Sequence, residues 1–157
     1  IEQPFATDAW QAHQIAQQQL TQLHISLDES LNDLADITRG LAIADAFTLK
    51  QAKVGGIWPT LQAIHQISVV DKIPWIGGML SSGVGRAVDL ALASMPATRQ
   101  VPADSSSASR YFERDIVLAQ PEIVAGRLPV PSTPGLGVTI DWSAVADLQA
   151  SDTITIK

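Results

Sequence analysis

The chain has 157 residues, 46% of them hydrophobic, and its 16 acidic and 10 basic side chains give a formal net charge of −6 at pH 7. This length and composition suffice for one domain with a buried core. The acidic balance argues against a general nucleic-acid or anionic-membrane surface. Cysteine is absent, which excludes disulfide frameworks and thiolate metal sites. No apolar run is long enough for a membrane span and no signal-peptide pattern opens the chain, so we expect a cytoplasmic protein.

Short β-type runs that end on charged or small residues recur along the first two thirds of the chain. They lie at residues 1–4, 25–28, 46–50, 73–76 and 100–103. Their ends are 22 to 28 residues apart, about the length of one strand and one crossover helix. The spacing predicts consecutive βα units. Since the first run resembles only the end of a strand, we interpret the chain as a fragment or a processed product.

The segments between these runs have apolar residues at helical spacing on one side only. They lie at residues 12–23, 31–42, 57–68 and 84–95. We expect Asp8 to cap the first helix and Ser30 the second, which should end near Gly40. Pro59 fits only in the first turn of the third helix. One-sided helices between strands with few polar interruptions predict a parallel sheet covered by helices.

The composition changes in the last third of the chain. A serine-rich stretch leads into an apparent short helix at residues 110–113, and beyond it proline and glycine punctuate short β-type runs. Pro134 and Gly135 form a strong turn signal. We therefore predict an α/β body over residues 1–115 and a β-rich tail over residues 116–157.

Several sequence motifs occur in a fixed order. They lie at residues 1–5, 27–30, 49–56, 74–80 and 82–86, with later matches at 91–96, 109–111, 115–116 and 130–137. Through them the chain resembles the C-terminal portion of the enolase superfamily, in its muconate-lactonizing-enzyme subgroup, and most closely the o-succinylbenzoate synthase / N-succinylamino acid racemase family. The resemblance implies a modified β/α barrel in which this chain supplies the ends of strands four to eight, with a tail that returns to a capping domain.

The resemblance also implies a chemistry: a proton α to a carboxylate is abstracted, and the resulting enediolate is stabilised by a divalent metal, Mg²⁺ or Mn²⁺. Glu2 and Asp28 match the second and third metal ligands of the family, while the first, an Asp on strand three, is not in this sequence. Lys50 matches the catalytic lysine at the end of strand six, which faces a second lysine on strand two. In racemisation the two lysines would exchange proton donor and acceptor roles, and in the synthase reaction Lys50 would support the anionic intermediate by its charge.

Each assignment has a structural alternative. A carboxylate at a strand end often only caps the next helix, and a lone lysine there is more often a solvated rim residue. The combination of Glu2, Asp28 and Lys50, one βα unit apart, favours a site. We expect Glu29 and Ser30 to support the ligands or to cap a helix. Lys53 takes a position that is usually basic in the family, and we expect it at the rim.

A glycine-rich stretch at residues 77–85 leads from a strand to a helix N-terminus, whose amides can hold a substrate carboxylate. Alternatively, these glycines only let the backbone pass close to the barrel mouth. By resemblance, Gly78, Met79 and Ser81 are the candidate substrate-binding residues. Ser81 stands where relatives usually have Glu, and Ala103 replaces a common Gly. The three histidines lack metal-like spacing, and the four tryptophans are expected to pack.

The resemblance thus implies the C-terminal part of a Mg²⁺-dependent o-succinylbenzoate synthase of menaquinone biosynthesis, which acts on a small-molecule carboxylate, with racemisation of N-succinylamino acids as a further expected activity. A dipeptide epimerase, a cycloisomerase and a non-catalytic half-barrel used for assembly are the alternatives. Five strands of an eight-strand barrel would leave two unpaired edges. We therefore expect a partner polypeptide that carries the cap and strands one to three, and a homo-oligomer when the protein is complete.

Overall fold

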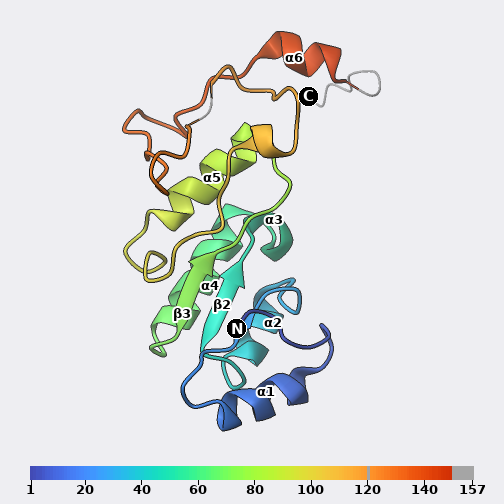
Figure 1. The fold of residues 1–157 in the computed structure, drawn as a ribbon, viewed down its shortest axis with the longest axis vertical. Coiled ribbons are helices and arrows are strands. Elements are labelled where there is room, and N and C mark those ends of the chain that lie inside the picture. The colour runs from blue at the N-terminus through green and yellow to red at the C-terminus, as the bar shows by residue number, and fades with distance from the viewer. Residues whose placement is uncertain (120, 150–157) are drawn as a thin grey trace.

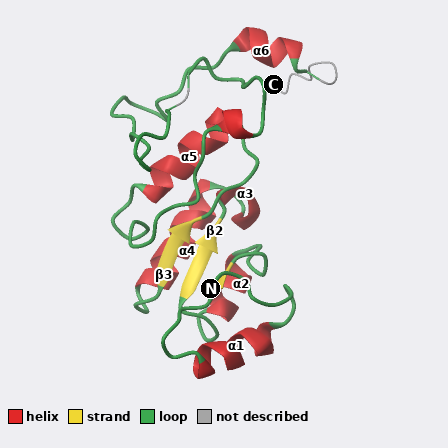
Figure 2. Ribbon diagram, in the orientation of Figure 1, coloured by secondary structure: helices red, strands yellow, loops and turns green. Residues whose placement is uncertain are grey.

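The computed structural model describes residues 1–119 and 121–149. Its sheet has three parallel strands in the order β1-β2-β3. Helices alternate with the strands along the chain (Figures 1 and 2). The strands are β1 (Ser26–Leu27), β2 (Ala46–Leu49) and β3 (Ile73–Ile76). The helices are α1 (Trp10–Gln19), α2 (Leu34–Gly40), α3 (Gln51–Val54), α4 (Ile57–Ser68), α5 (Gly83–Ala93) and α6 (Trp142–Asp147), with a 3₁₀ turn, η1, at Ala108–Arg110. The predicted α/β class with a parallel sheet is confirmed.

Both edges of the sheet are extended by a few backbone hydrogen bonds. Glu2 forms a parallel bridge with Ser26, which places the first segment beside β1. At the other edge, the amide of Asp104 donates to the carbonyl of Ile76 at 3.1 Å. The runs expected at residues 1–4 and 100–103 therefore lie beside the outer strands, although neither forms a regular strand of its own.

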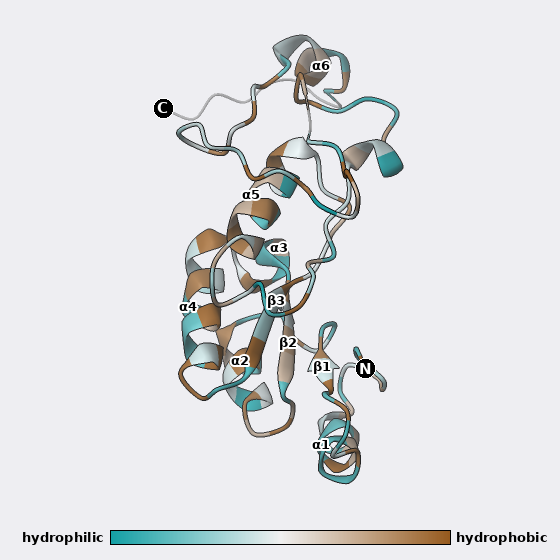
Figure 3. Cartoon of the chain, turned by 60° about the vertical axis from the view of Figure 1, so that its left-hand side comes forward, coloured by the Kyte–Doolittle hydropathy of each residue, from teal (hydrophilic) through white to brown (hydrophobic). Residues whose placement is uncertain are grey.

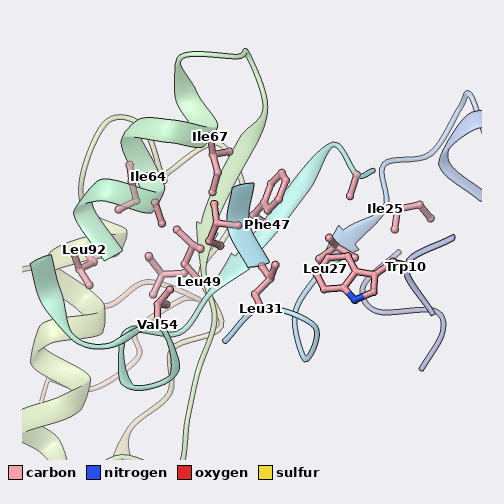
Figure 4. Close-up of a cluster of buried hydrophobic side chains, with 14 of the residues drawn as sticks. Trp10, Ile25, Leu27, Leu31, Phe47, Leu49, Val54, Ile64, Ile67 and Leu92 are labelled. Carbon is pink, nitrogen blue, oxygen red and sulfur yellow. The ribbon is translucent and has the colours of Figure 1, made fainter. Parts of the chain in front are cut away.

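The sheet has two chemically different faces, because successive side chains of a strand point to opposite sides. On one face, apolar side chains such as Leu27, Phe47 and Leu49 are fully buried in the main core (Figure 4). Helices α2 and α4 lie on this side of β2 and β3 (Figure 3). The opposite face carries polar groups at the alternating positions, among them Ser26 and Thr48, which gives the sheet one hydrophobic and one polar side.

The helix caps differ from the predicted ones. Helix α2 is capped by Asp33, whose side chain accepts the amides of Ala35 and Asp36, and not by Ser30. The chain first makes a turn in which the amide of Leu31 bonds the Asp28 carbonyl at 2.9 Å, so the helix begins later than its apolar spacing indicated. Helix α1 follows Ala9, and the proposed Asp8 cap is wrong because no side chain caps this helix.

The predicted positions of Gly40 and Pro59 in their helices are confirmed. Gly40 is the last residue of α2, where a Cβ would come within 2.8 Å of the Phe47 ring, so only glycine fits against the sheet. Pro59 lies in the first turn of α4, where its missing N–H costs no helix hydrogen bond. Among the described residues, no helix is long and apolar enough to cross a membrane.

The tail beyond residue 116 is not β-rich in its described part. It contains two isolated antiparallel bridges, Val117 with Ile140 and Val124 with Arg127, and the unforeseen helix α6, which lies at the opposite end of the molecule from α1 (Figure 1). Prolines recur at positions 121, 129, 131 and 134 and remove amide donors that a strand ladder needs. The turn at Pro134–Gly135 is present, and the β-type run at 153–156 lies outside the described residues.

The tryptophans do not all pack as expected. Trp10 is buried, with the Arg39 guanidinium 4.3 Å from the centre of its ring. Trp58 and Trp142 are exposed. His13 is fully buried and its Nδ1 lies 3.0 Å from the Ala9 carbonyl, which agrees with a structural role.

Candidate active site at the carboxyl ends of the strands

The two best-supported site residues are in direct contact. Asp28 follows β1 and Lys50 follows β2, so both leave the sheet at its carboxyl edge. The Lys50 ammonium donates a hydrogen bond to Oδ2 of Asp28, and the side chains are only 15% and 5% exposed. The parallel pairing of adjacent strands therefore brings together an acid and an amine that are 22 residues apart. Such a pair fixes the position of an amine that can give or take a proton.

The backbone around Asp28 is fixed by Gln3. The Gln3 Oε1 accepts the amide of Asp28 at 2.9 Å and that of Ser30 at 3.3 Å, while its Nε2 donates to the Ser30 hydroxyl at 2.8 Å. Gln3 itself has φ +35°, a region that non-glycine residues rarely adopt. These bonds offset the strain and lock the turn that carries the carboxylate. Ser30 thus supports the site as expected, whereas Glu29 is exposed.

Lys53 also reaches Asp28. Its ammonium donates to the Asp28 backbone carbonyl at 3.2 Å and lies 4.0 Å from Oδ1, so this residue belongs to the site and not only to its rim. At 4.0 Å the Oδ1 contact is too long for a hydrogen bond. The Oδ1 atom is buried without any hydrogen-bond partner among the described residues. An orphaned carboxylate oxygen beside a second acid is the type of group that a metal ion satisfies.

Glu2 supplies that second acid. Its Oε1 accepts a hydrogen bond from the Thr48 hydroxyl at 2.9 Å. Desolvation raises the pKa of Glu2 above its ordinary value and the neighbouring Asp28 carboxylate adds to the rise, although the Thr48 hydrogen bond and the Lys50 charge oppose it. Two carboxylates that disfavour each other's charge would be stabilised by a divalent cation between them.

The glycine-rich loop after β3 packs closely against residues of the site. A Cβ on Gly77 would lie 2.5 Å from Cγ2 of Thr48 and 3.0 Å from Cε of Lys50, so the lysine stem crosses the loop where there is no side chain. A Cβ on Gly78 would meet the Asp104 carbonyl at 2.3 Å. The structural alternative for these glycines, close passage of the backbone, is therefore supported.

Only two of the three predicted substrate-binding residues line the same pocket. Gly78 and Met79 line an open pocket of about 180 Å³, together with Leu80, Arg86, Asp104 and Tyr111. Ser81 is not among the lining residues. It packs against Gly85, where a Cβ would come within 2.8 Å of the serine Cβ.

The start of α5 differs from the expectation of free amides. The Gly83 amide donates to both carboxylate oxygens of Asp115, at 2.8 and 3.0 Å. A side chain of this chain thus occupies the Gly83 amide, and this favours the structural alternative over a substrate carboxylate at that amide.

Sequence reasoning missed the polar residues that support the acids. Thr48 contacts Glu2, and Trp75, expected only to pack, donates its indole N–H to Ser26. A signal was present, because Ser26 precedes Asp28 by two residues and Thr48 precedes Lys50 by two residues. Residues spaced by two in a strand share one face.

The metal-ligand set within the described residues is incomplete. No group of three His, Cys, Asp or Glu side chains that could hold a metal occurs in the part of the chain that the structure describes. The two adjacent carboxylates are hard oxygen donors of the type that Mg²⁺ prefers. They fit a divalent metal as two of its ligands.

Comparison with known proteins supports a common origin over most of the chain. A model of the enolase C-terminal domain-like family matches residues 1–144. The chain is 39% identical over 143 residues to an o-succinylbenzoate synthase of Listeria innocua, and the match covers 90% of this chain and 38% of that protein. It is 41% identical over 141 residues to an N-succinylamino acid racemase of Thermus thermophilus, with 88% and 37% covered.

Solved structures agree. A member of the enolase superfamily from Listeria innocua has a TM-score of 0.84 at 37% identity, and the match covers 94% of this chain and 40% of that one. A muconate lactonizing enzyme from Pseudomonas putida has a TM-score of 0.84 at 25% identity, with 94% and 41% covered. The chain spans about two fifths of the length of the relatives that it matches.

Proposed function

The chain belongs to the enolase C-terminal domain-like family of the enolase superfamily, and on this premise we propose that it supplies one side of the active site of an o-succinylbenzoate synthase. The enzyme would remove a proton α to a carboxylate and dehydrate its substrate, in menaquinone biosynthesis. Racemisation of N-succinylamino acids is the second activity that we propose for the same site. The observation that carries the proposal is the contact between Lys50 and Asp28 beside Glu2, on the polar face of the sheet.

Asp28 and Glu2 would hold a divalent metal, Mg²⁺ or Mn²⁺. The fit rests on the buried Oδ1 of Asp28, which accepts no hydrogen bond among the described residues, and on the Asp28 charge, which disfavours that of Glu2. When bound, the metal would neutralise the negative charge that develops on the substrate carboxylate. A third oxygen ligand would come from the part of the relatives' length that this chain does not cover.

Lys50 is the proposed proton-transfer or charge-stabilising group. Its stem is held across Gly77 and its ammonium at Asp28, so the amine has a fixed position at the carboxyl edge of the sheet. In racemisation it would give or take the α proton on one face of the substrate, and in dehydration its charge would stabilise the anionic intermediate. Lys53, bound to the Asp28 carbonyl, adds a second positive charge at the same place.

Gly78 and Met79 would contact the substrate in the pocket that they line next to this loop. Ser81 would act indirectly, through its packing against Gly85 at the start of α5. Because family members commonly have Glu at the Ser81 position, we propose that this serine changes substrate preference.

Cycloisomerisation is a second candidate function, because the chain is also 35% identical over 123 residues to a chloromuconate cycloisomerase of Pseudomonas putida, covering 74% of this chain and 32% of that protein. A dipeptide epimerase activity of the same superfamily would use the same acids and amine. A non-catalytic assembly role would leave the Lys50–Asp28 pair as a structural ion pair.

We also propose that the chain works with a polypeptide segment that carries the capping domain and barrel strands one to three. The complete protein would form a homo-oligomer. The polar face of the sheet, with Lys50 and Asp28 at its edge, would then line the inside of a closed barrel. Size-exclusion chromatography and thermal unfolding of this chain by itself test the proposal. A monodisperse 16.7 kDa monomer that melts cooperatively would contradict it.

The proposed function is tested with the complete protein and Mg²⁺. Formation of o-succinylbenzoate and racemisation of an N-succinylamino acid are measured before and after removal of metal with EDTA. We expect turnover in at least one assay, its loss with EDTA and its recovery with added Mg²⁺. Absence of both activities in a folded, metal-loaded protein would contradict the proposal and favour the assembly role.

A further inference from the structure

A continuous chain of side-chain hydrogen bonds crosses the polar face of the sheet. The Trp75 Nε1 lies 2.9 Å from the Ser26 hydroxyl, which lies 3.0 Å from the Thr48 hydroxyl, and Thr48 lies 2.9 Å from Oε1 of Glu2. These residues come from β3, β1, β2 and the first segment of the chain. The hydrogen bonds thus link every strand of the sheet to one acid.

The chemistry of the two end groups fixes the direction of these bonds. An indole N–H can only donate, and an ionised carboxylate can only accept. Thr48 gives its only proton to Glu2 and therefore accepts from the Ser26 hydroxyl, which itself accepts from Trp75. Each hydroxyl is used once as acceptor and once as donor, so neither can rotate without breaking a bond.

The strand register supports the same arrangement. Ser26 is paired with Glu2 on one side and with Ala46 on the other, and Thr48 is paired with Trp75. Paired residues of parallel strands place their side chains on the same face. Ser26 is 6% exposed and Thr48 is 2% exposed, so water does not compete for these bonds.

From this arrangement we infer that Thr48, held by Ser26 and Trp75, is a positioning residue that fixes the Glu2 carboxylate for divalent-cation binding. The inference rests on the proposed function, because it takes Glu2 as a metal ligand. Glu2 lies in an exposed segment, and the Thr48 hydroxyl ties one of its oxygens to the rigid sheet. Partners that orient metal ligands in this way typically contribute about 10- to 100-fold to metal affinity.

The test is calorimetric titration of the complete, metal-free protein with Mn²⁺ and Mg²⁺. Thr48→Val removes the hydroxyl and keeps the shape, and it should raise the dissociation constant about 10-fold or more. Thr48→Ser restores the hydroxyl and should bind the cation nearly as well as the unchanged protein. Thr60→Val is the matched control, because Thr60 of α4 is also buried but donates to the carbonyl of Gly56, the residue that precedes this helix.

A double-mutant cycle separates positioning from general destabilisation. Once Glu2→Gln has removed the ligand charge, adding Thr48→Val should cause little further loss of affinity. Equal affinity of Thr48→Val and Thr60→Val, or failure of Thr48→Ser to restore binding, would overturn the inference. If Thr48→Val does not fold, Trp75→Phe replaces it. A larger dissociation constant for the cation then supports the inference, and an unchanged one overturns it.

The two hypotheses fail differently. If Glu2→Gln itself leaves cation binding unchanged, the proposed metal role of Glu2 is wrong. If Glu2→Gln weakens binding and Thr48→Val does not, the metal role stands and only the positioning role of Thr48 is wrong.

Discussion

Lys50 and Asp28 form a hydrogen-bonded ion pair at the carboxyl edge of the sheet, with both side chains largely buried. A second pair, Lys72 with Asp45 at 3.3 Å, lies at the opposite, amino edge of the sheet, where the two residues precede β3 and β2. The two pairs have the same chemistry, but only the first adjoins another carboxylate. Comparison of the two therefore separates the effects of a site from those of an ordinary ion pair.

The Asp28 carboxylate should be essential for cation binding. Asp28→Asn removes the charge that would hold the proposed metal and should weaken Mn²⁺ binding by at least about 10-fold, measured by titration calorimetry. Asp45→Asn is the control and should leave binding unchanged. Equal affinities in the two variants would mean that Asp28 is not a ligand.

Gly77 should be required for the position of Lys50. Gly77→Ala places a methyl group within 3.0 Å of the lysine Cε and 2.5 Å of the Thr48 methyl, so the stem must move. Because a displacement of about 1 Å can cost about 100-fold in rate, we expect turnover to fall by 10-fold or more. Steady-state kinetics measure the loss. Full activity in the folded variant would show that the lysine stem does not depend on this gap.

Asp89 should make the stability of the protein depend on pH. Burial raises its pKa from 3.8 to about 6, against the opposing charge of Arg86. Between these pH values the folded state keeps a proton that the unfolded chain has lost. The stability contributed by this group therefore falls as the pH rises from about 4 to 6 and is lowest above pH 6.

Asp89→Asn should remove this dependence and raise the free energy of unfolding at pH 7, by on the order of 2 to 3 kcal/mol. Urea unfolding at pH 4 and pH 7 measures the difference. The exposed Asp71→Asn serves as the control. A variant that is destabilised equally at both pH values would contradict the prediction.

The cap of α2 should be worth about 1 kcal/mol. Asp33→Ala removes the acceptor for two backbone amides at 2.8 and 2.9 Å, and loss of such a cap typically costs about 0.5 to 2 kcal/mol. Chemical denaturation gives the value. The nearby exposed Glu29→Ala should be close to neutral, and an equal loss in both variants would argue against a specific cap.

The sequence predicted the elements whose pattern is local. The spacing of strand ends and the one-sided helices correctly predicted parallel βα units, because each strand and helix encodes its own periodicity. The meeting of Asp28 and Lys50 also followed, since parallel neighbours end at the same edge of a sheet. The predicted cap of α2 was wrong because it depends on turn geometry. The chain turns after Asp28, so α2 begins later and Asp33, not Ser30, caps it.

The hydrogen bonds that hold the site in place could not be predicted from the local sequence. Gln3 acts through its side chain on residues 25 to 27 positions away, and Asp115 reaches the Gly83 amide over 32 positions. Such contacts depend on tertiary packing, which no local pattern encodes. Thr48 and Ser26 left only a weak signal, the polar alternation before Lys50 and Asp28.

The most direct test of the central claim is exchange of the substrate α proton with deuterium from solvent, followed by NMR with an N-succinylamino acid and the metal-loaded complete protein. The account predicts that Lys50→Ala loses this exchange on one face of the substrate, whereas Lys72→Ala keeps it. Unchanged exchange in a folded Lys50→Ala variant would contradict the assignment of Lys50 as the group that moves the proton.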